Sequence, residues 1–189
     1  MGSSHSTLKT KSYSEKEFKE LAEKTHFNVY QVKEFYQQYI RLANSQRADG
    51  SIDLSEFQAA LSLRSNAFAH CIFSAFDKNN NSSLDFPEYL SGLSALSPEA
   101  SVQEKARFCF NIYDTDRNGT IEQNELNQIL TFSLQENTSI SISQDKIDKI
   151  VSSTFQKMDL DGDHKISYQE FEDMALKNPS ILNCANFKL

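Results

Sequence analysis

A short polar segment that ends on glutamate recurs four times along the 189-residue chain and constrains the fold more than any other feature. The four glutamates are Glu56, Glu88, Glu125 and Glu170. Around the last three, apolar residues at helical spacing lie both before and after the polar segment. A repeat of this length indicates one supersecondary unit used several times, here a helix, an acidic loop and a second helix.

The oxygen-rich composition of these segments matches what a calcium ion requires. A twelve-residue loop between two helices supplies about six to eight oxygens from positions 1, 3, 5, 7, 9 and 12, and turns on glycine at position 6. Residues 114–125 (loop III), DTDRNGTIEQNE, meet every requirement, with Gly119 at the turn and Ile121 placed for a strand contact with a partner loop. The predicted ligands are Asp114, Asp116, Asn118, the Thr120 carbonyl, Glu122 and Glu125.

Residues 77–88 (loop II), DKNNNSSLDFPE, carry a complete but less acidic set of ligands. The predicted ligands are Asp77, Asn79, Asn81, the Ser83 carbonyl, Asp85 and Glu88. Ser82 replaces the turn glycine, and a non-glycine residue in the left-handed region costs roughly 1 to 2 kcal/mol. We therefore expect loop II to bind calcium about tenfold more weakly than a glycine-containing loop. The sequence does not distinguish Ca²⁺ from Mg²⁺ in this loop.

Residues 159–170 (loop IV), DLDGDHKISYQE, place a histidine where the chain should turn on glycine. The predicted ligands are Asp159, Asp161, Asp163, the Lys165 carbonyl and Glu170, with a water held by Ser167. Histidine is enriched among residues with positive φ. We therefore expect His164 to make the turn, with its side chain pointing outward, and loop IV to be a functional calcium site.

Residues 45–56 (loop I) depart from this pattern. With Ile52 at position 8 and Glu56 at position 12, position 3 falls on Arg47, and an arginine among the ligands repels a cation. We expect a degenerate unit that binds no metal and still pairs with loop II.

Charge and composition exclude several classes of function. The net charge of −7 disfavours a nucleic-acid partner, which usually needs a basic face. No apolar run approaches the roughly 18 residues that span a bilayer. The three cysteines, Cys71, Cys109 and Cys184, form no CxxC pair, which favours reduced thiols in a cytoplasmic protein. We find no catalytic triad context, His/Cys cluster or glycine-rich phosphate loop, and so expect no enzyme activity.

Breaks in the helical pattern divide the chain into two predicted halves, residues 1–96 and 97–189, each with a pair of loops. At LSPEA, Ser97 is expected to cap a helix that begins at Pro98. A second polar stretch, SLQENTSISIS at 133–143, separates the third unit from the fourth.

Taken together, the four units resemble the EF-hand calcium sensors of the calcineurin B, plant calcineurin B-like and neuronal calcium sensor group. THFNVYQVKEFYQQY before the first loop and KNPSIL after the fourth add to this resemblance, which covers nearly the whole chain. It implies an all-α fold of four EF-hand units in two paired lobes, with short β contacts between paired loops. LANSQRADGSIDLSEF also resembles the lengthened first loop of plant calcineurin B-like proteins, which implies an alternative 14-residue calcium site from Ala43 to Glu56.

The first residues, MGSSHS, fit the pattern for N-myristoylation, with Gly2 as the acceptor. A single myristoyl chain gives only marginal membrane affinity, and no cysteine nearby offers a second lipid site. We therefore expect a cytoplasmic protein that contacts membranes reversibly.

The function that we expect is calcium sensing, in which ion binding exposes an apolar groove that grips an amphipathic helix of a target protein. The resemblance implies a phosphatase catalytic subunit or a protein kinase as the target. Candidate groove residues are Phe35, Tyr36, Tyr39, Phe57, Leu61, Phe73 and Leu93. The apolar tail, with Ile181, Leu182, Phe187 and Leu189, is expected to cover the groove when no target is bound. The alternative is a calcium buffer, in which exposed apolar surface changes little on binding.

Overall fold

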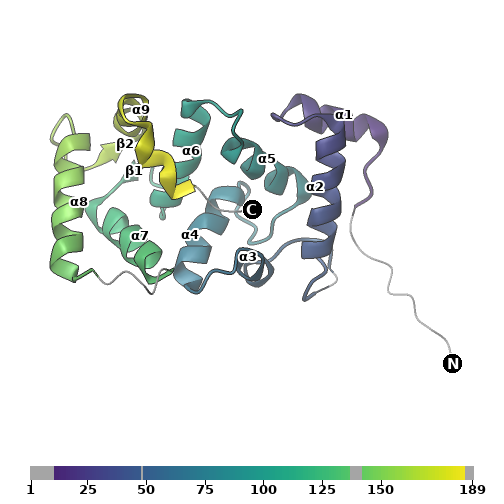
Figure 1. The fold of residues 1–189 in the computed structure, drawn as a ribbon, viewed down its shortest axis with the longest axis horizontal. Helices are drawn as coiled ribbons and strands as arrows, with labels where there is room; N and C mark the ends of the chain where they lie inside the picture. The colour runs from purple at the N-terminus through teal and green to yellow at the C-terminus, as the bar shows by residue number, and fades with distance from the viewer. Residues whose placement is uncertain (1–10, 48, 137–141, 186–189) are drawn as a thin grey trace.

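The computed structural model describes residues 11–47, 49–136 and 142–185, and its helices form an elongated array with α1 and α2 at one end and α8 at the other (Figure 1). The helices are α1 (Glu15–Glu23), α2 (Val29–Leu42), α3 (Leu54–Ala60), α4 (Asn66–Phe76), α5 (Phe86–Leu96), α6 (Val102–Tyr113), α7 (Gln123–Glu136), α8 (Gln144–Met158) and α9 (Tyr168–Lys177). Two short strands, β1 (Thr120–Ile121) and β2 (Ile166–Ser167), and a 3₁₀ helix, η1 (Pro179–Ala185), complete the described chain. Gly2, Phe187 and Leu189 lie outside the described residues.

Capping boxes start six of these helices. The capping residues are Ser14, Asn28, Asp53, Asp85, Ser101 and Ser167, each paired with the side chain three residues further on. The predicted helix start at Ser97 is wrong, because Ser97 instead ends α5. The reason is local: Ser101 has Glu104 at the third helical position and closes a full capping box, whereas Ser97 would have Ala100 there.

The loops pair through very short β contacts. β1 and β2 join loops III and IV in antiparallel register, with Thr120 opposite Ser167 and Ile121 opposite Ile166. In the other half, Ile52 and Leu84 exchange two backbone hydrogen bonds of 3.1 and 2.8 Å. All four position-8 side chains are at most 1% exposed. The fold is therefore mostly helical with paired EF-hand loops, as predicted from the sequence.

Buried apolar side chains form a cluster that runs through both halves of the chain, since α6 packs on both α4 and α5. Within this cluster, Phe76 makes edge contacts with Phe57 and Phe108 at ring-centroid distances of 5.3 and 5.1 Å. Gly92 on α5 faces this ring so closely that a Cβ there would lie 2.1 Å from it. The division into two lobes stays a prediction, because helices from both halves share this core.

Two further segments pack onto the EF-hand helices. Ahead of α1, Tyr13 stacks edge-on against Tyr36 and Phe86. At the other end, η1 lies against α6 and α9 and buries Leu182.

The polar stretch predicted to separate the third and fourth units begins later than expected, because α7 continues to Glu136. Within the described residues, no helix is both long and apolar enough to cross a membrane.

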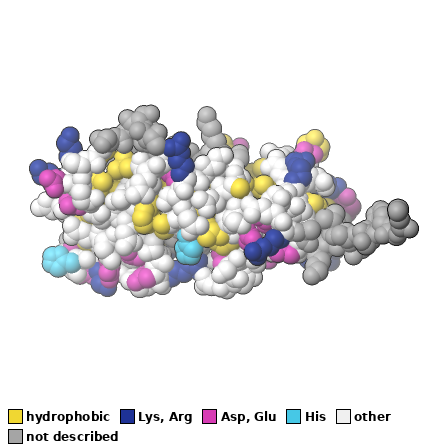
Figure 2. Space-filling view, turned by 90° about the horizontal axis from the view of Figure 1, so that it is seen from below, with side chains coloured by type: hydrophobic (Ala, Val, Ile, Leu, Met, Phe, Trp, Pro, Cys, Tyr) yellow, Lys and Arg dark blue, Asp and Glu magenta, His cyan; other side chains and the backbone are white. Residues whose placement is uncertain are grey.

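The surface carries charges of both signs. In the view of Figure 2, hydrophobic side chains appear in several small patches separated by polar atoms, and Lys, Arg, Asp and Glu are interspersed among them. Among the described residues, the most exposed large hydrophobic side chains are scattered over different elements: Tyr30, Ile150, Leu160 and Leu176. A binding surface is therefore expected in a cavity between helices rather than on one broad apolar face.

Candidate metal centres

The glutamate at position 12 is held in the same way in all four loops. One carboxylate oxygen accepts backbone N–H groups from the start of the loop, and the other accepts the N–H of position 9. Glu56, Glu88 and Glu125 are nearly fully buried. In loops I, II and IV the same glutamate completes the capping box of the helix that follows. The helix cap therefore positions the residue that would bind a cation with both oxygens.

Loop III brings three of its acidic groups together. One carboxylate oxygen each from Asp114, Asp116 and Glu125 lies within 4.8 Å of the others. Asp114 is buried and accepts the N–H groups of Asn118 and Gly119, each at 3.0 Å, while Gly119 turns with a φ of +87°. Burial, and then the neighbouring Glu125 charge, raise the pKa of the Asp114 carboxyl. A divalent cation would relieve both effects, so these oxygens fit Ca²⁺.

The remaining predicted ligands of loop III are placed differently. Asn118 accepts the N–H of Thr120 at 2.9 Å within the loop, so its side-chain oxygen faces the turn. Glu122 is directed to Lys165 of loop IV, with the Lys165 Nζ atom 3.2 Å from its carboxylate. The structure therefore places Glu122 in an ion pair between the paired loops, outside the acidic cluster of loop III.

Loop IV repeats the acidic cluster with Asp159, Asp161 and Glu170, whose carboxylate oxygens also lie within 4.8 Å of one another. His164 has a φ of +66°, so the prediction that it makes the turn is confirmed, and its backbone N–H donates to Asp159 at 3.1 Å. Burial opposes ionisation of Glu170, but hydrogen bonds from Ser167 and Leu160 outweigh it and keep its pKa below the ordinary value. Loop IV also fits Ca²⁺ by its oxygen donors.

Two predicted groups of loop IV take other positions. Asp163 lies outside the acidic cluster and accepts the N–H of Lys165 at 2.8 Å. The Ser167 hydroxyl, expected to hold a water, donates to Glu170 at 2.8 Å. A Ser-x-x-Glu spacing at 167–170 is the sequence signal that would have identified this capping role.

Loop II has the same backbone form with a weaker set of acidic groups. Asp77 and Glu88 are buried, and Asp77 accepts the N–H groups of Asn81 and Ser82 at 3.2 and 2.9 Å. Asp85 accepts the N–H of Glu88 at 2.8 Å as a helix cap. Ser82 adopts a φ of +63°, the strained turn that the sequence predicts. Asn79 and Ser83 lie within the loop, where Asn79 accepts the N–H of Asn81 and Ser83 donates to Asn81.

Loop I keeps the turn and the final glutamate of the other loops. Gly50 makes the turn with a φ of +86°, and Glu56 accepts the N–H groups of Gln46 and Arg47 at 3.1 and 3.2 Å. The Arg47 guanidinium is mostly exposed and lies 3.8 Å from the carboxylate of Asp53 at position 9, so a positive side chain stands beside the predicted ligand positions of loop I. The alternative 14-residue register from Ala43 to Glu56 stays a prediction: Ala43 is the buried cap at the end of α2, the place that position 1 takes in loops II, III and IV.

Tyr39, predicted from the sequence as a groove residue, instead connects two of the loops. Its hydroxyl lies 2.9 Å from the Gly50 carbonyl oxygen and 3.0 Å from that of Leu84. It therefore links loop I to loop II beside their β contact. Burial is the main cause that raises the pKa of Tyr39, so the hydroxyl keeps its proton for these bonds.

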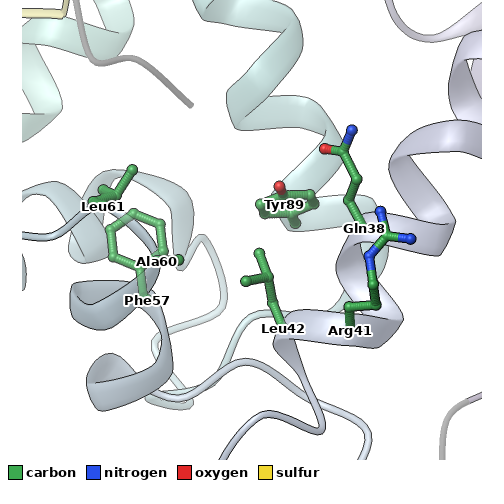
Figure 3. A pocket seen from close by; sticks show the side chains of 7 residues that line it. All are labelled: Gln38, Arg41, Leu42, Phe57, Ala60, Leu61 and Tyr89. Atoms are coloured by element: carbon green, nitrogen blue, oxygen red, sulfur yellow. The ribbon is translucent and has the colours of Figure 1, made fainter.

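An apolar pocket of about 260 Å³ lies between α2, α3 and α5 (Figure 3). Its lining residues are Gln38, Arg41, Leu42, Phe57, Ala60, Leu61 and Tyr89. Of the predicted groove residues, Phe57 and Leu61 line this pocket. Tyr36, Tyr39, Phe73 and Leu93 are buried in the core, and Phe35 packs on Phe27 at a ring-centroid distance of 4.6 Å.

Comparison with known proteins agrees with this geometry. Residues 103–176 match the family model of the EF-hand domain pair. The chain is 33% identical to the calcineurin B protein of Schizosaccharomyces pombe over 84% of its length and 87% of that protein, and 33% identical to the calcineurin B protein of Candida glabrata over 80% and 83%. It is 30% identical to the type 2 calcineurin B protein of Dictyostelium discoideum over 90% and 87%. The chain is thus a calcium-binding regulatory protein, not an enzyme, and belongs to the calcineurin B family of EF-hand proteins.

Proposed function

We propose that this protein is a calcium sensor in which loops II, III and IV bind Ca²⁺ and the ion-bound form docks a helix of a target enzyme. The observation that carries the proposal is the convergence of the carboxylates at positions 1, 3 and 12 in loops III and IV, where the glutamate at position 12 accepts the backbone N–H of position 9. Loop II is the weaker third site, because it has fewer carboxylates and a strained Ser82. Loop I pairs with loop II and binds no metal ion.

The pocket between α2, α3 and α5 is the proposed docking site. Its walls include Leu42, Phe57 and Leu61, which suit an apolar side chain, and Arg41 at its edge suits an acidic residue on the same helix (Figure 3). Tyr89 directly follows Glu88 on α5. A cation that draws Glu88 inward would therefore also move a wall of the pocket.

The target that the family relationship favours is a phosphatase catalytic subunit, because the relatives are named as subunits of calcineurin. A protein kinase is the second candidate, from the resemblance to plant calcineurin B-like sensors. The sequence predicts that the apolar tail covers the groove when no target is bound. The described part of the tail, η1, packs instead on α6 and α9 and buries Leu182, away from the residues that line the α2, α3 and α5 pocket. We therefore do not propose that the tail covers the pocket.

The proposed location is the cytoplasm, with reversible membrane contact through a myristoyl group on Gly2. The support is the sequence pattern alone, since Gly2 lies outside the described residues. Intact-mass measurement of the protein expressed with an N-myristoyltransferase is expected to show the added acyl mass in the wild type and not in Gly2→Ala. An unmodified wild type would contradict this part of the proposal.

The sensor is tested by following an apolar dye and a helical peptide from a calcineurin catalytic subunit during calcium titration. We expect dye fluorescence to rise with calcium and the peptide to bind only when calcium is present. Leu61→Glu should weaken peptide binding at least tenfold, because it puts a charge in the pocket. Leu176→Glu, the same change at an exposed site on α9, should not. Calcium binding with no change in dye or peptide signal would favour the buffer instead.

A further inference from the structure

Loop III reaches across to the end of α4, the helix that leads into loop II. The Nη2 atom of Arg117 donates to the carbonyl oxygens of Ser74 and Asp77, at 2.5 and 2.9 Å. Arg117 stands at position 4 of loop III, between the cluster residue Asp116 and the predicted ligand Asn118. Asp77 is position 1 of loop II. One side chain therefore joins the backbones of two candidate calcium loops that share no β contact with each other.

The last residue of α7 holds the opposite end of the same helix. The two carboxylate oxygens of Glu136 accept the backbone N–H groups of Arg64 and Ser65, at 2.8 and 2.7 Å. Ser65 is the N-cap of α4. Helices α4 and α7 also pack against each other. Loop III and α7 thus grip α4 at both of its ends.

The charges of this grip match the polarity of α4. A helix carries partial positive charge at its N-terminus and partial negative charge at its C-terminus. Glu136 places a carboxylate at the first of these ends and Arg117 places a guanidinium at the second. Such charge-assisted hydrogen bonds are stronger than neutral ones. We call Arg117 and Glu136 together the α4 clamp.

We propose that the α4 clamp makes calcium binding at loops II and III mutually cooperative, an inference that rests on both loops being calcium sites as proposed above. An ion in loop III fixes the backbone on both sides of Arg117 and so fixes its hold on Asp77 and on the end of α4. An ion in loop II orders the same carbonyl from the other side. The first ion to bind orders the shared clamp. Binding of the second ion then costs the protein less conformational entropy.

Arg117 and Glu136 are therefore positioning residues, and affinity alone would not reveal their role. Removing a guanidinium beside two acidic loops favours cations at both, whatever the clamp does. The informative quantity is the coupling factor, the ratio by which silencing one loop lowers the calcium affinity of the other. Linkage requires this factor to be the same in both directions.

The experiment measures that factor by calorimetric calcium titration of the full chain. Glu88→Gln silences loop II and Glu125→Gln silences loop III, each in the wild type and in the clamp variant Arg117→Ala/Glu136→Gln. The matched control is Arg64→Ala/Glu34→Gln, which makes the same charge changes. Arg64 meets the clamp only through its backbone N–H, and Glu34 is exposed on α2, at the far end of the molecule from α7 (Figure 1).

We expect a wild-type coupling factor of roughly fivefold or more, equal in both directions, retained in the control and close to one in the clamp variant. Coupling between loops III and IV, read with Glu170→Gln, should persist in the clamp variant, because β1 and β2 carry it. That result shows that the variant is folded and that loop III still works. A coupling factor near one in the wild type would contradict the clamp and leave the proposed function intact. A coupling factor in the clamp variant equal to that of the wild type would do the same. A wild-type chain in which loop II or III binds no calcium overturns both.

Discussion

At the scale of single residues, the strain of each turn depends on its two positions with positive φ: the fourth, held by Asn80, Arg117 and Gly162 in loops II, III and IV, and the sixth. Gly119 adopts its φ of +87° without a side-chain penalty, whereas Ser82 and His164 take +63° and +66° with a Cβ in place. The carboxylates around them are held by backbone N–H groups in the same way in each loop. The loops therefore differ in turn strain and in acidity rather than in backbone form.

Replacing Ser82 by glycine is expected to strengthen calcium binding at loop II. Removing a penalty of about 1 kcal/mol corresponds to roughly fivefold tighter binding. The measurement is a calcium titration of the full chain, with Ser83→Gly as the control, since Ser83 lies next in the loop outside the left-handed region. Equal effects of the two substitutions would show that turn strain does not limit loop II.

The Glu17 carboxyl at the start of α1 gives a pH-dependent prediction. Hydrogen bonds from the Ser14 backbone and the Lys11 side chain lower its pKa from the ordinary 4.5 to about 2. Because the folded pKa lies below the unfolded one, this group stabilises the fold above pH 4.5, and the contribution is lost as pH falls towards 2. Ser14→Ala should move the pKa part of the way back up, as followed by NMR titration. An unchanged pKa would exclude the capping hydroxyl as a cause.

At the scale of elements, the close crossing of α4 and α5 depends on Gly92. Phe76 occupies the space where a side chain at Gly92 would begin, 2.1 Å away. Neither residue stands out in the sequence, because the contact depends on how two helices cross and not on a local pattern. The same is true of Tyr39, which joins loops I and II through two carbonyl oxygens distant in the chain.

Gly92→Ala is expected to destabilise the protein by roughly 1 to 3 kcal/mol, because the added methyl overpacks the core. The measurement is urea unfolding of the calcium-loaded chain. Phe76→Leu is expected to lower the stability of the wild type. It should lower the stability of the Gly92→Ala variant by less, because the smaller side chain leaves space for the added methyl. Strict additivity of the two substitutions would show that the contact does not set the helix crossing.

At the scale of the whole molecule, the repeat of acidic loops was sufficient to predict four EF-hand units and the pairing of their loops. Predictions of helix starts and ends from local patterns were wrong where a contact outside the pattern determined the structure. Ser101 took the helix start that Ser97 was expected to make, because Glu104 completes its capping box. Helix α7 extends into a polar stretch as far as Glu136, whose carboxylate binds the cap region of α4. Contacts between residues so far apart in sequence leave no signal in local spacing.

The central claim is that three of the four loops bind calcium. It is tested most directly by the calcium stoichiometry of the full chain, measured by isothermal titration calorimetry. We predict three ions per chain, two in each of Glu88→Gln, Glu125→Gln and Glu170→Gln, and three still in Glu56→Gln, because the Arg47 guanidinium beside Asp53 opposes a cation in loop I. A stoichiometry of two, or the loss of an ion in Glu56→Gln, would contradict it.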